Sequence, residues 1–136
     1  MKVLEKYPDF KVVAKPDSNW DATTARNVTT TMLQQNPDIC AIIDFWDGDA
    51  SGTAAAIRDA GKEGKVALVT TGGGEKVDCD KLESGEFTAV VMTELARQSS
   101  DMNAIIKLLL QSGQPAGTIK SYIYTCLLYT SPSPRD

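Results

Sequence analysis

Histidine is absent from this chain of 136 residues. Its absence removes the commonest general base near neutral pH and the commonest zinc ligand. Basic residues are not concentrated anywhere: the formal net charge is −4, and no patch or helix is rich in lysine and arginine. Nucleic acid and a membrane surface are therefore not expected as partners.

Cysteine is scarce, and long apolar runs are missing. Cys40, Cys79 and Cys126 lie far apart, without the spacing of a metal or redox motif. Cys40 falls in an apolar run and is expected to be a small core residue. No apolar run approaches the length that spans a bilayer, and residues 1–8 lack the apolar segment of a signal peptide. The length suits one domain with a sizeable core.

The rest of the chain is organised around residues 39–61. The apolar run Ile39–Phe45 predicts a strand buried on both faces. A tight turn follows, and then small and apolar residues at helical spacing predict a helix from about Asp49, which Gly61 would end. In an open parallel sheet, such a strand–turn–helix unit places its turn at the edge where ligands bind.

Strands and helices alternate along the whole chain. Further strands are expected at residues 10–14, 65–70, 86–92 and 119–125, and the end of a helix at residues 1–6. A helix capped by Asp21 or Thr23 would follow the first strand, a short helix would end at Leu82, and the helix 94–111 would turn Leu95, Met102, Ile105, Ile106 and Leu109 inward. This order predicts an α/β fold with an open, mostly parallel sheet and helices on both faces.

Candidate ligand contacts come directly after the predicted strands. They are Trp20, Trp46, Asp47, Gly72 and Thr93. Indole faces suit the C–H side of a sugar or an aromatic ligand. The alternative, that an indole only seals the sheet edge, stays open for Trp20, whereas ligand contact is favoured for Trp46. Asp47 and Asp49 could instead cap a helix, and at least one of them is expected to do only that.

Neither a metal site nor a cofactor is expected. The stretch 47–52 matches the opening of a calcium loop, but Arg58 stands where the twelfth, acidic ligand should be. Asp47 and Asp49 also form a D-x-D pair after a strand, as in haloacid-dehalogenase-like phosphatases. That chemistry needs Mg²⁺ held by a later acidic pair, and Glu94 is alone there. The phosphatase is kept as an alternative.

Several stretches together resemble the second lobe of type I periplasmic sugar-binding proteins, the receptors of ABC importers. They are residues 7–13, 19–21, 33–39, 46–61 and 82–89. The resemblance covers residues 1–125 and implies the C-terminal lobe of such a receptor, truncated at both ends. It implies a non-enzymatic, periplasmic protein that binds a small-molecule ligand, a sugar, between two lobes. The implied partners are the N-terminal lobe and a membrane permease.

The same resemblance assigns roles to individual residues. Trp20 matches the aromatic position that stacks on the sugar, and Asp47 matches the aspartate of an Asn-Asp pair. Trp46 stands where the asparagine would be, Gly72 where an aspartate often binds sugar, and Thr93 where glutamine is common. Polar residues of the family have thus been lost or changed at several of these positions. The resemblance therefore implies a ligand held more by stacking than by a dense network of hydrogen bonds to hydroxyls.

Effector domains of LacI-type repressors share this lobe, but residues 61–66 lack their usual Val-Pro-x-Asp approach to a strand. The repressor remains an alternative.

Residues 126–136 abandon the pattern and resemble a translated transposase sequencing adapter. They are expected to be artefactual and disordered.

Overall fold

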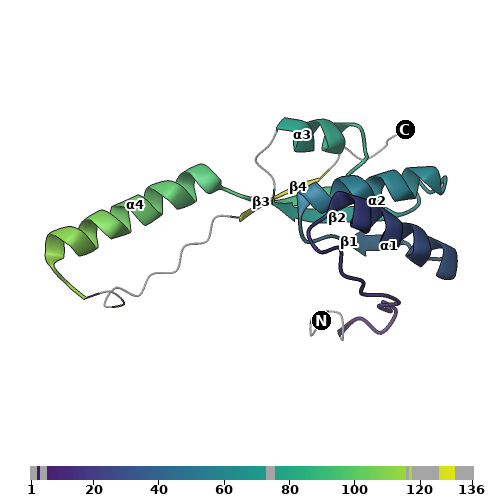
Figure 1. Cartoon of the computed structure of the whole chain (residues 1–136), viewed down its shortest axis with the longest axis horizontal. Coiled ribbons are helices and arrows are strands. Elements are labelled where there is room, and N and C mark those ends of the chain that lie inside the picture. Colours follow the sequence, from purple (N-terminus) through teal and green to yellow (C-terminus); the bar gives the residue numbers. More distant parts are fainter. Residues whose placement is uncertain (1–2, 4–5, 73–75, 116, 118–125, 131–136) are drawn as a thin grey trace.

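The chain folds around one open sheet (Figure 1). The computed structural model describes residues 3, 6–72, 76–115 and 117, and the backbone of residues 126–130. Within these residues the sheet order is β1 (Ala41–Ile43), β2 (Ala67–Gly72), β3 (Ala89–Thr93) and β4 (Cys126–Thr130). The first three strands are parallel, and β4 is antiparallel to β3. The predicted α/β class with an open, mostly parallel sheet is confirmed.

The described helices are α1 (Ala22–Gln35), α2 (Asp47–Asp59), α3 (Lys76–Glu83) and α4 (Leu95–Ser112). α1 begins as the sequence predicts, because the Asp21 carboxylate accepts the backbone N–H of Thr24 at 2.7 Å and so acts as its N-cap. No helix in the described part of the chain is both long and apolar enough to cross a membrane.

The hydrophobic core lies against one face of the sheet. Leu68 of β2 and Val90 of β3 point to that face, because Val90 pairs with Thr70, two residues beyond Leu68. Helices α1, α2 and α3 contribute Leu33, Ala50, Ala54, Ile57 and Leu82 to the cluster, and the segments just before β2 and β3 contribute Val66 and Phe87. Burying such side chains is the main favourable contribution to folding.

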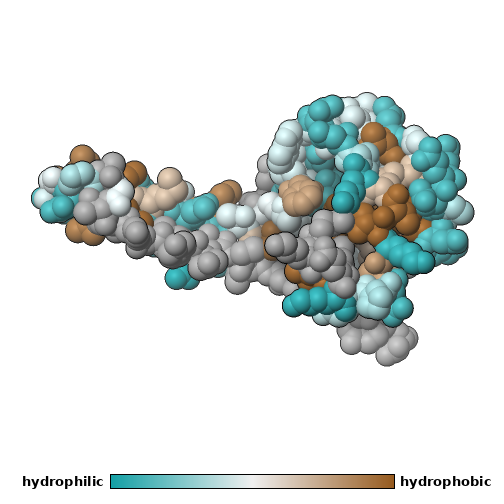
Figure 2. Space-filling view, turned by 90° about the horizontal axis from the view of Figure 1, so that it is seen from below, coloured by the Kyte–Doolittle hydropathy of each residue, from teal (hydrophilic) through white to brown (hydrophobic). Residues whose placement is uncertain are grey.

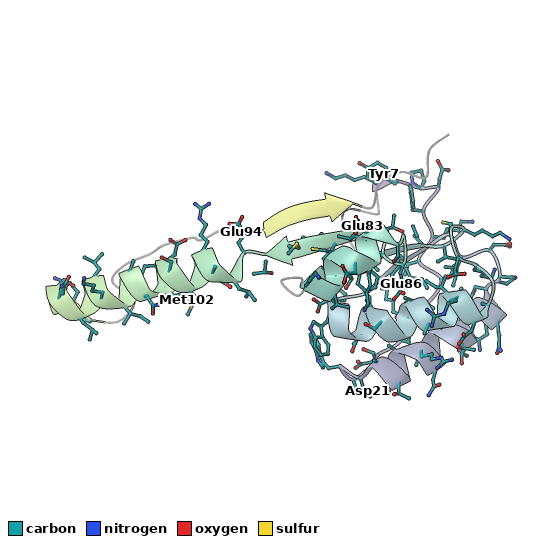
Figure 3. The ribbon with its side chains drawn as sticks, turned by 90° about the horizontal axis from the view of Figure 1, so that it is seen from above. Tyr7, Asp21, Glu83, Glu86, Glu94 and Met102 are labelled. Atoms are coloured by element: carbon teal, nitrogen blue, oxygen red, sulfur yellow. The ribbon has the colours of Figure 1, made fainter. Side chains whose placement is uncertain are left out.

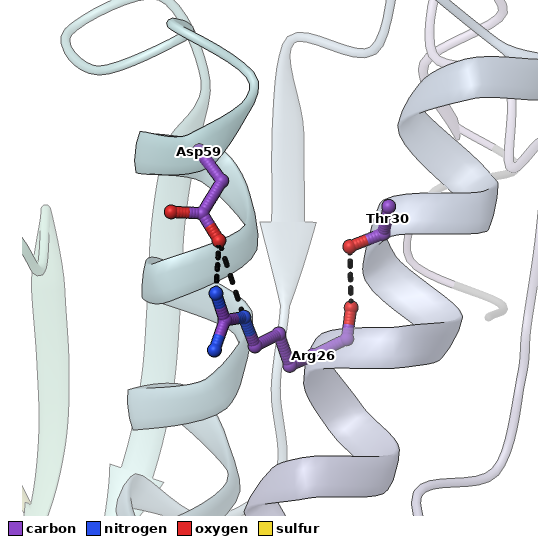
Figure 4. A network of polar contacts seen from close by, with 3 residues as sticks. All are labelled: Arg26, Thr30 and Asp59. Atoms are coloured by element: carbon purple, nitrogen blue, oxygen red, sulfur yellow. Dashed lines mark hydrogen bonds and ion pairs between the residues drawn. The ribbon is translucent and has the colours of Figure 1, made fainter.

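α1 and α2 pack closely against each other. Gly52 allows this approach, because a Cβ there would overlap the carbonyl oxygen of Ala22. The Arg26 guanidinium of α1 donates to the Asp59 carboxylate of α2 at 2.5 Å (Figure 4). Both side chains of that ion pair are about half exposed, so the packing at Gly52 matters more than the pair.

The N-terminal strand expected at residues 10–14 does not form. A turn precedes these residues: the Phe10 N–H donates to the Tyr7 carbonyl at 3.0 Å, and the two rings meet edge to face at 6.2 Å. β1 is therefore at an edge of the sheet, and Ile43 is exposed rather than buried on both faces. Cys40, expected in the core, is exposed for the same reason. Figure 2 shows apolar surface, in brown, on the larger part of the molecule.

α4 differs from its prediction in packing but not in extent. The helix forms over Leu95–Ser112, but none of its residues is buried. Figures 1 and 3 show why: α4 extends away from the sheet, beyond the junction at Glu94, and Met102 lies far from the other helices. The apolar spacing correctly placed residues on one face, but no described element covers that face.

The C-terminal tail also departs from expectation. Residues 126–130 form β4 rather than a disordered end, in register with β3 from Ala89↔Thr130 to Thr93↔Cys126. A short apolar segment can pair with any free strand edge, whatever its origin. The adapter origin of the tail stays a prediction. The strand expected at 119–125 and the glycines at 73–74 lie outside the described residues.

Candidate ligand-binding site

Two indoles meet where α1 and α2 begin. Trp20 lies just before α1 and Trp46 just before α2, with ring centroids 6.1 Å apart and planes inclined by 54°. Trp20 is 71% exposed and Trp46 is 41% exposed. The pair presents an aromatic surface to solvent rather than filling the core.

Trp46 is held by the start of α2. Its backbone is extended (φ −146°, ψ 135°) at the N-cap position, and its indole lies over Gly48. A Cβ at Gly48 would come within 2.6 Å of the ring carbons. Glycine at this position therefore permits the observed position of the indole.

Trp20 is held by an unusual loop. Asn19 and Trp20 both have left-handed backbones, with φ of 52° and 58°. This region is unfavourable for residues with a side chain, and such conformations persist where the surroundings hold them. Close by, the Asn19 N–H donates to the Asp17 carboxylate at 2.9 Å, and the Ser18 hydroxyl donates to the Asp49 carboxylate of α2.

Asp47 and Gly72 bring the start of α2 against the end of β2. Asp47 occupies the first helical turn, and its Oδ1 accepts the Gly48 N–H at 3.0 Å. Gly72 has a φ of 116°, and a Cβ there would lie 2.8 Å from that same Oδ1. A side chain at position 72 would have to displace Asp47. Glycine at this position therefore allows the observed position of the Asp47 carboxylate.

Two further carboxylates lie beneath the surface of the site. Asp49 is 3% exposed, and Asp44 is half-buried and accepts the Thr53 hydroxyl at 2.7 Å. Burial raises the pKa of Asp44 above its ordinary value; the Thr53 hydrogen bond opposes this, and the charge of Asp49 adds to it. In the described residues, no three acidic or cysteine side chains are grouped so as to hold a metal ion.

The structure brings the predicted residues together in two contacts. Trp20 meets Trp46, and Asp47 meets Gly72. Thr93 ends β3 one residue past Met92, the partner of Gly72, and so shares the same sheet edge. The hydrogen bond between Ser18 and Asp49 was not predicted. The sequence had indicated Asp49 as a helix cap or as part of a D-x-D pair. The ligand-binding role of all these residues stays a prediction.

Comparison with known proteins decides the family. A family model described as "Periplasmic binding protein domain" matches residues 1–115. The chain belongs to the periplasmic binding protein family. Among curated relatives, the D-allose-binding periplasmic protein of Escherichia coli (strain K12) is 34% identical over 118 residues, which are 87% of this chain and 36% of that protein. The D-apiose import binding protein of Actinobacillus succinogenes is 25% identical over 134 residues, 98% of this chain and 43% of the relative.

Solved periplasmic binding proteins have the same fold. An ABC transporter solute-binding protein from Actinobacillus succinogenes with bound D-allose matches at a TM-score of 0.79 and 26% identity, covering 96% of this chain and 45% of that one. One from Agrobacterium vitis with bound D-fucose matches in fold at 0.77 and 24% identity, covering 95% of this chain and 43% of that one. The chain thus spans less than half the length of these relatives.

Proposed function

We propose that this chain supplies one side of a sugar-binding cleft in a receptor of an ABC importer. The observation that carries the proposal is the exposed pair of Trp20 and Trp46 at the sheet edge, beside the Asp47 carboxylate. Indole faces contact the C–H surface of a sugar, and a carboxylate accepts hydrogen bonds from its hydroxyls. The relatives named for D-allose and D-apiose point to the same ligand class.

The composition of the site favours a ligand held largely by stacking. Two indoles provide contact area, whereas Gly72 contributes no side chain and leaves room for Asp47. Thr93, at the same edge, would contribute a hydroxyl. A sugar here would therefore be recognised through its apolar face and a few hydroxyls near Asp47.

The complete receptor would need a second lobe. In a two-lobe receptor the ligand is enclosed when the lobes close about a hinge, so each lobe alone provides only part of the contact. We therefore expect this chain alone to bind sugars more weakly than about 1 μM, which corresponds to about 8 kcal/mol. The receptor would act in the periplasm and deliver its sugar to a membrane permease.

A binding role fits the site better than the enzyme alternative. A phosphatase that used Asp47 as nucleophile would need Asp49 to reach the substrate as its acid/base partner. Asp49 is 3% exposed and accepts the Ser18 hydroxyl, so it is turned away from solvent. The named relatives are binding proteins.

The gene itself provides the test of the receptor proposal. A long sequencing read through the locus should reveal a signal peptide and a second α/β lobe upstream of this stretch. The protein expressed from that gene should bind a sugar at micromolar affinity or tighter in calorimetry, and this chain alone should bind it more weakly. A helix-turn-helix upstream would instead make the chain the effector domain of a repressor.

A further inference from the structure

The loop that carries Trp20 is tied to α2 by one long-range hydrogen bond. The Ser18 hydroxyl donates to Oδ2 of Asp49, which lies 31 residues further along the chain. Ser18 is two residues before Trp20, and Asp49 is three residues after Trp46. The bond therefore links the segments that carry the two indoles.

This link differs from the other hydrogen bonds given for the described part of the loop, because those are local. The bonds from Asn19 N–H to Asp17 and from Asp21 N–H to the Ser18 carbonyl join residues two or three positions apart. They shape the turn but do not place it against α2. The side chain of Trp20 is 71% exposed, so its own packing restrains it little.

Asp49 is suited to act as the fixed end of this link. Its side chain is buried in the first turn of α2, where the positive end of the helix dipole favours a carboxylate. Its other oxygen, Oδ1, is buried and has no hydrogen-bond partner among the described residues. A buried carboxylate without a hydrogen-bond partner is unfavourable. The Ser18 hydroxyl provides such a partner for Asp49.

We propose that Ser18 and Asp49 are positioning residues, whose hydrogen bond holds Trp20 in its left-handed loop and so sets the indole pair for a ligand. The proposal rests on the function proposed above for its link to sugar binding, but the placement of the indoles can be tested without a ligand. Loss of the bond lets Trp20 leave Trp46. A sugar must then order the Trp20 side chain when it binds, which weakens its affinity.

The test uses Ser18→Ala in the full chain, with two spectroscopic readouts. Trp20 and Trp46 are the chain's two tryptophans. Their coupled absorption gives a paired-sign circular dichroism band, and each indole N–H gives its own nuclear magnetic resonance signal. Ser18→Ala should collapse the paired band and move the Trp20 signal toward that of a free indole. Ser18→Ala should also lower the urea midpoint, because it leaves the buried Asp49 carboxylate without this hydrogen bond. Both spectra are therefore recorded without urea, where the variant is folded.

Matched variants make the result decisive. Ser18→Thr keeps the hydroxyl and should restore both signals, and Ser84→Ala, the same change at an exposed residue after α3, should leave them unchanged. If Ser18→Ala does not fold, Ser18→Cys replaces the hydroxyl by a weaker donor and takes the same measurements. An unchanged paired band in a folded variant that lacks the hydroxyl would overturn the proposal.

The sugar titration separates this proposal from the function on which it rests. With D-allose as the probe, Ser18→Ala should raise the dissociation constant by about threefold to tenfold, the effect of having to order one large side chain on binding. A changed indole spectrum in a chain to which no sugar binds would support the positioning role and count against the proposed function. An unchanged spectrum with intact sugar binding would do the reverse.

Discussion

Gly52 of α2 lies directly against the backbone of Ala22 at the start of α1. A Cβ at position 52 would be 2.7 Å from the carbonyl carbon of Ala22 and would overlap its oxygen. The neighbour is backbone and cannot rotate away. This contact sets the approach of the two helices, and Trp20 and Trp46 lie just before their first residues.

Gly52→Ala should therefore destabilise the protein. Alanine is favoured over glycine in a helix by about 1 kcal/mol, but overpacking against backbone costs about 1–3 kcal/mol or more. The net loss in the free energy of unfolding should reach about 1–2 kcal/mol in urea titrations. A stability equal to or above that of the wild type would show that α1 and α2 do not pack in this way.

Gly48→Ala is the matched control in the same helix. The three atoms nearest to a Cβ at Gly48 all belong to the Trp46 ring, which can rotate to make room. The free energy of unfolding should stay within about 1 kcal/mol of the wild type, since helix propensity rises while one side chain moves. The indole fluorescence should change, because Trp46 leaves its place. Unchanged fluorescence would mean that the indole does not lie over Gly48.

None of the residues of α4 is buried, and this can be tested by comparing a leucine-to-alanine substitution in the core with one in α4. Leu68 of β2 is 1% exposed, whereas Leu110 of α4 is 79% exposed. Leu68→Ala should lower the free energy of unfolding by about 2–5 kcal/mol, as in other cores. Leu110→Ala should change it by about 0.5 kcal/mol or less, as at other exposed positions. A loss of several kcal/mol for Leu110→Ala would show that α4 packs against another surface.

Asp44 should make stability depend on pH. Its pKa is raised from the ordinary value of 3.8, chiefly by burial, so its protonated form is favoured in the folded chain. The stability that this proton contributes is full below the unfolded pKa and is lost as pH rises through the folded pKa. Asparagine is neutral at every pH, so the Asp44→Asn variant does not lose this stability as pH rises. Its free energy of unfolding, relative to that of the wild type, should therefore be higher at pH 7 than at acidic pH.

Urea unfolding of Asp44→Asn and wild type, at neutral pH and below pH 3.8, measures this difference. Asp38→Asn provides the baseline for removing one exposed carboxylate. The account is contradicted if the Asp44→Asn variant shows the same difference from wild type at both pH values.

Local signals in the sequence predicted local structure well. Asp21 was expected to cap α1 and does so, and the apolar runs at 65–70 and 86–92 correspond to β2 and β3. These features depend on residues a few positions apart, whose hydrogen bonds and side-chain periodicity can be read directly.

Features that depend on distant partners were predicted less well. The spacing of apolar residues in α4 showed which side chains share a face, but not whether another element covers them. Ile43 was expected to be buried because it lies in an apolar run, but β1 is at the edge of the described sheet and Ile43 is exposed. The hydrogen bond from Ser18 to Asp49 joins two loop ends that no local pattern connects.

Trp20 and Trp46 are proposed to contact a sugar together. The most direct test is a D-allose titration of the chain, extended into the millimolar range, while the two indole N–H resonances are recorded separately. We predict that both resonances shift with a common dissociation constant, and that Trp46→Ala abolishes the shift of Trp20. If both resonances stay fixed with D-allose, and also with D-apiose and D-fucose, the two indoles do not contact a sugar together.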